Sequence, residues 1–171
     1  AKKRDFLAYG IEIDFTDEAL CILARRAYEE STGARGLVGA LEKALLNFEK
    51  KLPSIGIEKF TVTAETVEDP ETSLKKLLSD HSLQRFIDTF FASHGTRLKF
   101  GQEARELVKK MASQQDRSPE ELCTELFADY GHGLKLVEQQ EFEITTAVLL
   151  NPQESLNALI KEFYSRRGQE N

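Results

Sequence analysis

One short segment of the chain, Gly33-Ala34-Arg35, combines residue types that suit anion binding. Arg35 is expected in the first turn of a helix, where a cation is locally unfavourable because the N-terminus carries about half a positive charge. Gly33 directly precedes that turn and can adopt backbone conformations that let a ligand come close. A guanidinium beside free N–H groups favours an anion held at this place. The alternative is a solvated arginine with no ligand, and the segment alone leaves both open.

Regular elements on both sides must position this segment. Alternation of apolar and polar residues predicts strands, a period of three to four residues predicts helices, and Pro or capping side chains mark their ends. We expect a strand over 11–15, a helix capped by Thr16 or Asp17, a second helix capped by Ser31 or Thr32 and ending near Leu52-Pro53, a strand over 58–64, and a long helix over 71–93.

The second half of the chain repeats this order. Gly10 and Phe15 each have a counterpart 85 positions later, at Gly95 and Phe100, and the offset then falls to 82, at which Phe60 meets Phe142. An internal repeat is best sought first because missing one misassigns the whole fold. The sequence therefore predicts a mainly helical α+β protein with two tandem strand-helix-helix-strand-helix units, a first domain over 1–80 and a degenerate second copy over 81–171.

The run around Arg35 resembles the small C-terminal (lid) domain of ClpX-like AAA+ unfoldases. The resemblance covers about 10–67, roughly a third of the chain, and it is carried by these segments in order: Phe15-Thr16-Asp17-Glu18-Ala19-Leu20, Ala24-Arg25-Arg26-Ala27, Thr32-Gly33-Ala34-Arg35-Gly36-Leu37, Glu42, Leu45-Leu46 and Leu52-Pro53-Ser54. In that family the Gly-Ala-Arg segment is the sensor 2 motif, which here is Gly33, Ala34 and Arg35.

The resemblance implies that Arg35 reaches the phosphates of ATP or ADP, bound with Mg²⁺ by a large domain of the full-length protein. Guanidinium groups suit this role because they bind phosphate bidentately. The implied function is ATP-dependent unfolding or remodelling of proteins in the cytoplasm. The implied partners are the chain's own large domain, neighbouring subunits of a hexameric ring, protein substrates and, in some such machines, a protease.

The sequence departs from the family's pattern at a few positions. Val38 stands where the family often has a basic residue, and Glu49 and Lys50 stand where bulky apolar residues are common. In the second copy, Ser118-Pro119-Glu120 replaces Gly33-Ala34-Arg35. An acidic residue in place of the arginine predicts that the second copy does not bind a nucleotide phosphate in the same way, and that it is a structural or docking appendage.

Catalytic motifs are missing from the sequence. No Gly-x-x-x-x-Gly-Lys-Ser/Thr segment occurs, nor an acidic strand of the Walker B type, so we expect no ATP hydrolysis and no bound nucleotide for this chain alone. The first residue is Ala rather than Met, and we expect a longer protein. A rival interpretation is a non-catalytic protein-interaction module in which Arg35 is incidental, and an upstream Walker A motif would separate the two.

Composition argues against other classes of function. The net charge of -6 disfavours nucleic-acid binding, and we expect neither a membrane span nor a signal peptide. The histidines are too scattered for a metal site, and the two cysteines lie in helical patterns that predict small buried residues. The residues concerned are His81, His94, His132, Cys21 and Cys123.

Two further segments are interpreted without a functional role. The pair Arg25-Arg26 lies between apolar positions and is interpreted as a solvated edge. The segment Gly131-His132-Gly133 is interpreted as a turn rather than a site.

Overall fold

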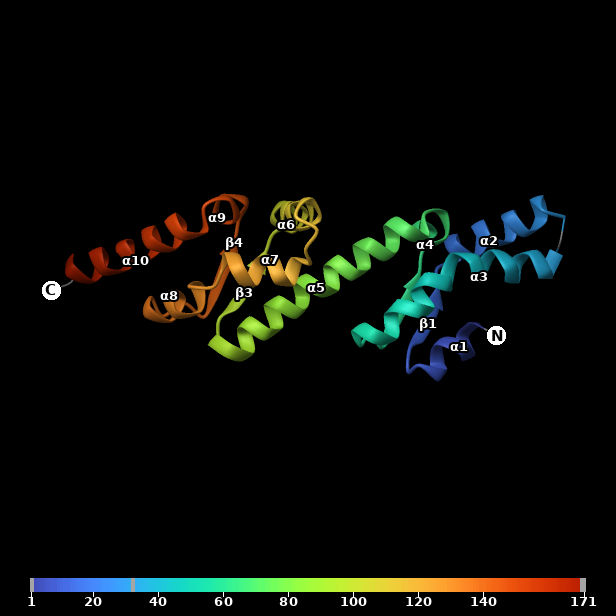
Figure 1. Ribbon diagram of the computed structural model, residues 1–171, viewed down its shortest axis with the longest axis horizontal. Helices are drawn as coiled ribbons and strands as arrows, with labels where there is room; N and C mark the ends of the chain where they lie inside the picture. Colours follow the sequence, from blue (N-terminus) through green and yellow to red (C-terminus); the bar gives the residue numbers. More distant parts are fainter. Residues whose placement is uncertain (1, 32, 170–171) are drawn as a thin grey trace. The chain divides into compact units, whose positions relative to one another are not determined.

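The computed structural model describes residues 2–31 and 33–169 of the 171-residue chain (Figure 1). The chain is mainly helical and carries two small parallel strand pairs, which confirms the predicted α+β class. It divides into two compact units, unit 1 over residues 1–77 and unit 2 over residues 78–171, and the division falls within one long helix. None of the helices in the described residues is long and apolar enough to span a membrane.

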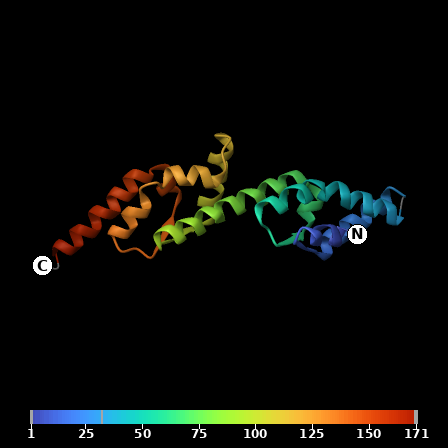
Figure 2. The same ribbon diagram turned by 60° about the horizontal axis from the view of Figure 1, so that its bottom comes forward.

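Unit 1 holds the segment around Arg35. Its elements are α1 (Lys2–Ala8), β1 (Glu12–Phe15), α2 (Asp17–Glu29), α3 (Gly33–Lys51), the 3-10 helix η1 (Leu52–Ile55), β2 (Lys59–Val62), α4 (Ala64–Glu68) and the beginning of α5 (Pro70–His94). Figures 1 and 2 both show α2 and α3 lying side by side along most of their length.

Capping and strand alternation fix this arrangement. Thr16 is the N-cap of α2, because its hydroxyl accepts a hydrogen bond from the backbone N–H of Ala19 at 3.2 Å. The two strands pair in parallel with Ile13 opposite Phe60, both buried, so the crossover through α2 and α3 covers their apolar face. Together with Phe48 on α3, these side chains form the centre of the unit 1 core.

Helix α1 adds an ion pair between residues 47 positions apart, which local sequence patterns do not predict. The Nζ of Lys2 donates to Glu49 at 2.8 Å, and both side chains are largely shielded from solvent. The hydrogen bond to Glu49 raises the pKa of Lys2 above its ordinary value. The departure of Glu49 from the family's apolar preference therefore has a structural reason, since it is the partner of a cation on α1.

Unit 2 repeats the same order of strands and α-helices, except that two α-helices occupy the positions that correspond to α3. Besides the end of α5 it contains β3 (Arg97–Phe100), α6 (Gln102–Gln114), α7 (Pro119–Leu126), α8 (Tyr130–Leu136), β4 (Glu141–Ile144), α9 (Thr146–Leu150) and α10 (Pro152–Gln169). The strands pair in parallel with Arg97 opposite Glu141, as Glu12 lies opposite Lys59 in unit 1. These positions correspond at the offsets of 85 and 82, so both units have the same strand register.

The segment Gly131-His132-Gly133, interpreted from its glycines as a turn, is part of α8. Both glycines serve close packing rather than a turn. A Cβ on Gly133 would lie 2.6 Å from a methyl carbon of Leu156, and one on Gly131 would lie 2.3 Å from the ring of His94. The glycines therefore let α8 approach α10 and α5, an effect visible only once the helices are placed.

The two cysteines have different surroundings. Cys123 is buried in the unit 2 core, and burial raises the pKa of its thiol to about 12. Cys21 is exposed on α2, so the prediction that both are buried was wrong for Cys21. The thiol tolerates exposure there because α2 buries Ala19 and Leu23 on its opposite face. Within the described residues no group of three or more His, Cys, Asp or Glu side chains is arranged to hold a metal ion.

Candidate functional site

The turn between α2 and α3 has an unusual backbone. Ser31 and Gly33 both lie in the left-handed region, with φ of 54° and 56°. Ser31 therefore does not have the extended backbone of an N-cap, and the alternative cap, Thr32, lies outside the described residues. A Cβ added to Gly33 would meet no atom within 4 Å, so glycine is favoured there by conformation and not by lack of space.

Arg35 lies in the first turn of α3, as the sequence predicts. Ala34 and Arg35 are both exposed, and no acidic residue stands in that first turn. Within residues 2–31 and 33–169, the side chain of Arg35 takes part in no hydrogen bond or salt bridge. Among the described residues, this cation therefore has no partner that would compete with an anion from outside the unit.

The spacing along α3 determines what Arg35 shares a face with. Val38, Glu42 and Leu46 follow it at helical intervals, and all three are exposed. The opposite face carries Ala44 and Phe48 into the core. Arg35 thus belongs to a surface that unit 1 itself leaves uncovered.

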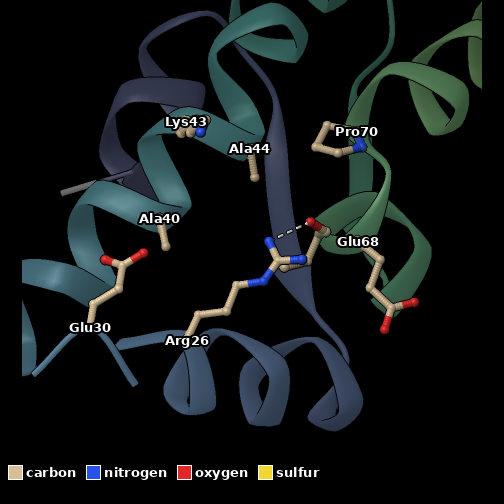
Figure 3. A pocket seen from close by; sticks show the side chains of 8 residues that line it. Arg26, Glu30, Ala40, Lys43, Ala44, Glu68 and Pro70 are labelled. Atoms are coloured by element: carbon tan, nitrogen blue, oxygen red, sulfur yellow. Dashed lines mark hydrogen bonds between the residues drawn. The ribbon is translucent and has the colours of Figure 1, made fainter. Parts of the chain in front are cut away.

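A groove of about 460 Å³ lies on another side of α3, between α2, α3 and α4 (Figure 3). Its floor is made of small apolar side chains, and charges of both signs line its walls. The lining residues are Arg26, Glu30, Ala40, Lys43, Ala44, Val67, Glu68 and Pro70. Arg35 is not among them, so the groove and the helix start are separate features of unit 1.

Arg26 is the central side chain of this groove. Figure 3 shows it extending from α2 toward the end of α4, where its guanidinium donates to the carbonyl oxygen of Val67 at 2.9 Å. The interpretation of Arg25-Arg26 as a solvated edge was therefore wrong for Arg26, which is partly buried and ties α2 to α4. The partner is a backbone carbonyl 41 residues away, which leaves no signal in the local sequence.

Replacing Arg26 by alanine is expected to destabilise unit 1 by about 1.5–3 kcal/mol, the range for a hydrogen bond that involves a charged group. Urea denaturation followed by circular dichroism measures the change. The matched control is Arg25→Ala at the exposed neighbouring position, which is expected to change the free energy of unfolding by less than about 0.5 kcal/mol. Equal losses from the two variants would contradict a tethering role for Arg26.

At the corresponding helix start in unit 2, the backbone N–H groups are already hydrogen-bonded to side chains of the same unit. Glu120, at the position that corresponds to Arg35, donates its backbone N–H to the hydroxyl of Ser82 at 3.0 Å. Ser118 and Glu121 form a reciprocal capping box around the same turn. The carboxylate of Glu120 lies 3.7 Å from the Nε of Arg85 on α5. These contacts satisfy the N–H groups that an anion would need, and the charge at this position is negative.

Comparisons with known proteins find similarity over unit 1. Residues 2–51, which include the segment 33–35, match the family described as the C-terminal, D2-small domain of ClpB protein. The ATP-dependent protease ATPase subunit HslU of Oceanobacillus iheyensis is 37% identical over 83 residues, covering 46% of this chain and 17% of the relative. The mitochondrial ATP-dependent clpX-like chaperone of Saccharomyces cerevisiae is 31% identical over 106 residues, covering 62% and 19%.

The chain spans less than a fifth of the length of these curated relatives. No solved structure matches it. The family match runs from α1 to the end of α3, and both relatives are ATP-dependent proteins by their descriptions. Over the residues that these comparisons match, unit 1 is similar to the C-terminal small domains of the Clp-type AAA+ ATPases.

Proposed function

We propose that this chain is the C-terminal lid of an ATP-dependent protein-unfolding machine, and that Arg35 is its sensor 2 arginine. The observation that carries the proposal is the exposed Arg35 in the first turn of α3, two residues after Gly33 in the left-handed conformation. The large domain of the same protein binds ATP or ADP with Mg²⁺, and Arg35 contacts the phosphates across the domain boundary. The closing or opening of that contact couples nucleotide state to the angle between the domains.

The partners follow from the same role. Unit 1 packs between a large domain and a neighbouring ring subunit, and the exposed face of Arg35, Val38 and Leu46 is available for such contacts. The relatives that match this chain include a protease ATPase subunit and a chaperone. Their descriptions support the proposal that this protein acts on protein substrates and works with a protease. We place the protein in the cytoplasm. Unit 2, whose helix start is closed by Ser82 and the capping box, is a degenerate second copy that has lost the arginine.

The test is Arg35→Ala in the full-length protein. ATP hydrolysis, measured by an enzyme-coupled phosphate assay, is expected to fall about ten- to a hundred-fold, because a charge-assisted contact to phosphate is worth about 1.5–3 kcal/mol. The circular dichroism spectrum is expected to stay unchanged, because the side chain is exposed.

Arg25→Ala is the matched control, since it removes an exposed arginine from α2 without touching the start of α3. It is expected to retain wild-type hydrolysis. Unchanged hydrolysis and unchanged nucleotide affinity in Arg35→Ala would overturn the sensor role and favour the interaction module.

A further inference from the structure

Unit 2 contains a pocket that the proposed nucleotide-sensing role does not use. It has a volume of about 180 Å³ and lies between α5 and α7. Aromatic and hydroxyl-bearing side chains line it, together with one carboxylate. The lining residues are Phe86, Thr89, Phe90, Ser93, His94, Glu120, Thr124, Phe127 and Ala128. Sites for drug-sized ligands usually measure roughly 300–1,000 Å³, so this pocket is sized for a single side chain.

Three aromatic rings give the pocket apolar walls. Phe86, Phe90 and Phe127 are buried, with ring centroids 5.8 Å apart for Phe86 and Phe90 and 6.1 Å apart for Phe86 and Phe127. The ring of His94 packs on Phe90 at 4.7 Å, and Thr89 and Thr124 are exposed at the mouth. Such walls accept an apolar stem or the face of a planar cation.

The carboxylate of Glu120 gives the pocket its charge. No Lys or Arg is among the lining residues. Arg85 lies outside the lining, with its side chain 60% exposed, and forms a salt bridge with the carboxylate of Glu120 at 3.7 Å. The Glu120 side chain keeps 32% of its surface exposed, and within the described residues its oxygens accept no hydrogen bond. The backbone of Glu120 is held by the hydroxyl of Ser82, so the carboxylate is presented from a fixed position.

We propose that this pocket receives an arginine side chain of a protein partner. The carboxylate pairs with the guanidinium, and the aromatic walls take its planar face and its methylene stem. A phosphate or a carboxylate ligand is excluded by the charge of Glu120. The chain thus presents opposite charges at two corresponding helix starts, with Arg35 directed to an anion in unit 1 and Glu120 to a cation in unit 2.

The experiment is an NMR titration of the full 171-residue chain with acetyl-arginine amide at constant salt and pH 7.5. Saturable shifts are expected in the amides of α5 near Thr89, of α7 from Glu120 onward, and of Phe127 directly after α7. Acetyl-citrulline amide is the neutral probe of nearly the same shape. It is expected to bind at least ten-fold more weakly, because it lacks the positive charge.

Two variants test the assignment. Glu120→Gln is expected to weaken arginine binding at least ten-fold, whereas Glu154→Gln, an exposed carboxylate at the start of α10, leaves it unchanged. If Glu120→Gln fails to fold, Thr89→Trp serves instead, because a large ring at this exposed position closes the mouth of the pocket and abolishes binding. Three results would each overturn the proposal. The first is equal binding of the arginine and citrulline probes, and the second is undiminished arginine binding by Glu120→Gln or its substitute Thr89→Trp. The third is no saturable shift at α5 and α7.

Discussion

Phe48→Ala is expected to lower the free energy of unfolding of unit 1 by about 3–5 kcal/mol. The side chain is 0% exposed, and its ring stacks on Phe60 with centroids 4.9 Å apart. It therefore joins α3 to β2, and its removal leaves a cavity that the rigid strand pair fills poorly. Small domains have a total stability of about 5–15 kcal/mol, so the loss is a large fraction of it.

Urea denaturation and amide hydrogen exchange measure the effect of Phe48→Ala. The matched control is Leu46→Ala, two residues away on the same helix, where the side chain is 50% exposed. The control is expected to cost less than about 1 kcal/mol. A loss in Phe48→Ala no larger than that of the control would show that the ring is not a core contact.

Phe127→Ala is expected to destabilise unit 2 by a similar 3–5 kcal/mol or so. Phe127 lies in the break between α7 and α8, and its ring contacts three other aromatic rings. The centroid distances are 4.9 Å to Tyr130, 6.1 Å to Phe86 and 6.3 Å to Phe100. Loss of the ring removes buried area and these aromatic pairs together.

The readout for Phe127→Ala is amide exchange resolved along the chain. Since the core around Phe127 consists of unit 2 side chains, amides after residue 94 are expected to lose protection while those of α2 and α3 keep it. Phe91→Ala is the control, because that ring is 42% exposed and lies beneath the guanidinium of Arg97 at 4.7 Å. A uniform loss of protection over the whole chain would contradict the division into two units.

Local sequence patterns predicted the secondary structure around the site well. Apolar alternation at Ile13 and at Phe60 located the strands, and the repeat offsets gave the matching positions in unit 2. These features depend on residues close together in sequence. The position of Arg35 in a first helical turn could be predicted for the same reason, because a helix start is a local feature of the sequence.

Features that depend on distant contacts were missed. Arg26 was interpreted as solvated because its acceptor is a carbonyl on α4, and Glu49 was noted only as a departure because its partner lies on α1. The pocket of unit 2 requires α5 and α7 to be brought together before Glu120 and Phe90 can share a lining. No spacing rule connects such residues, so only the folded arrangement reveals them.

The connection into the second strand of each pair differs in length between the units. In unit 1, seven positions separate buried Leu52 from Lys59 and include η1, whereas in unit 2 only four separate buried Val137 from Glu141. Both strands nevertheless begin at the same rung of their ladders. The segment that follows Leu52 is therefore the place to insert a fluorescent label or an affinity tag, because the difference in length between the two units leaves the strand ladder intact.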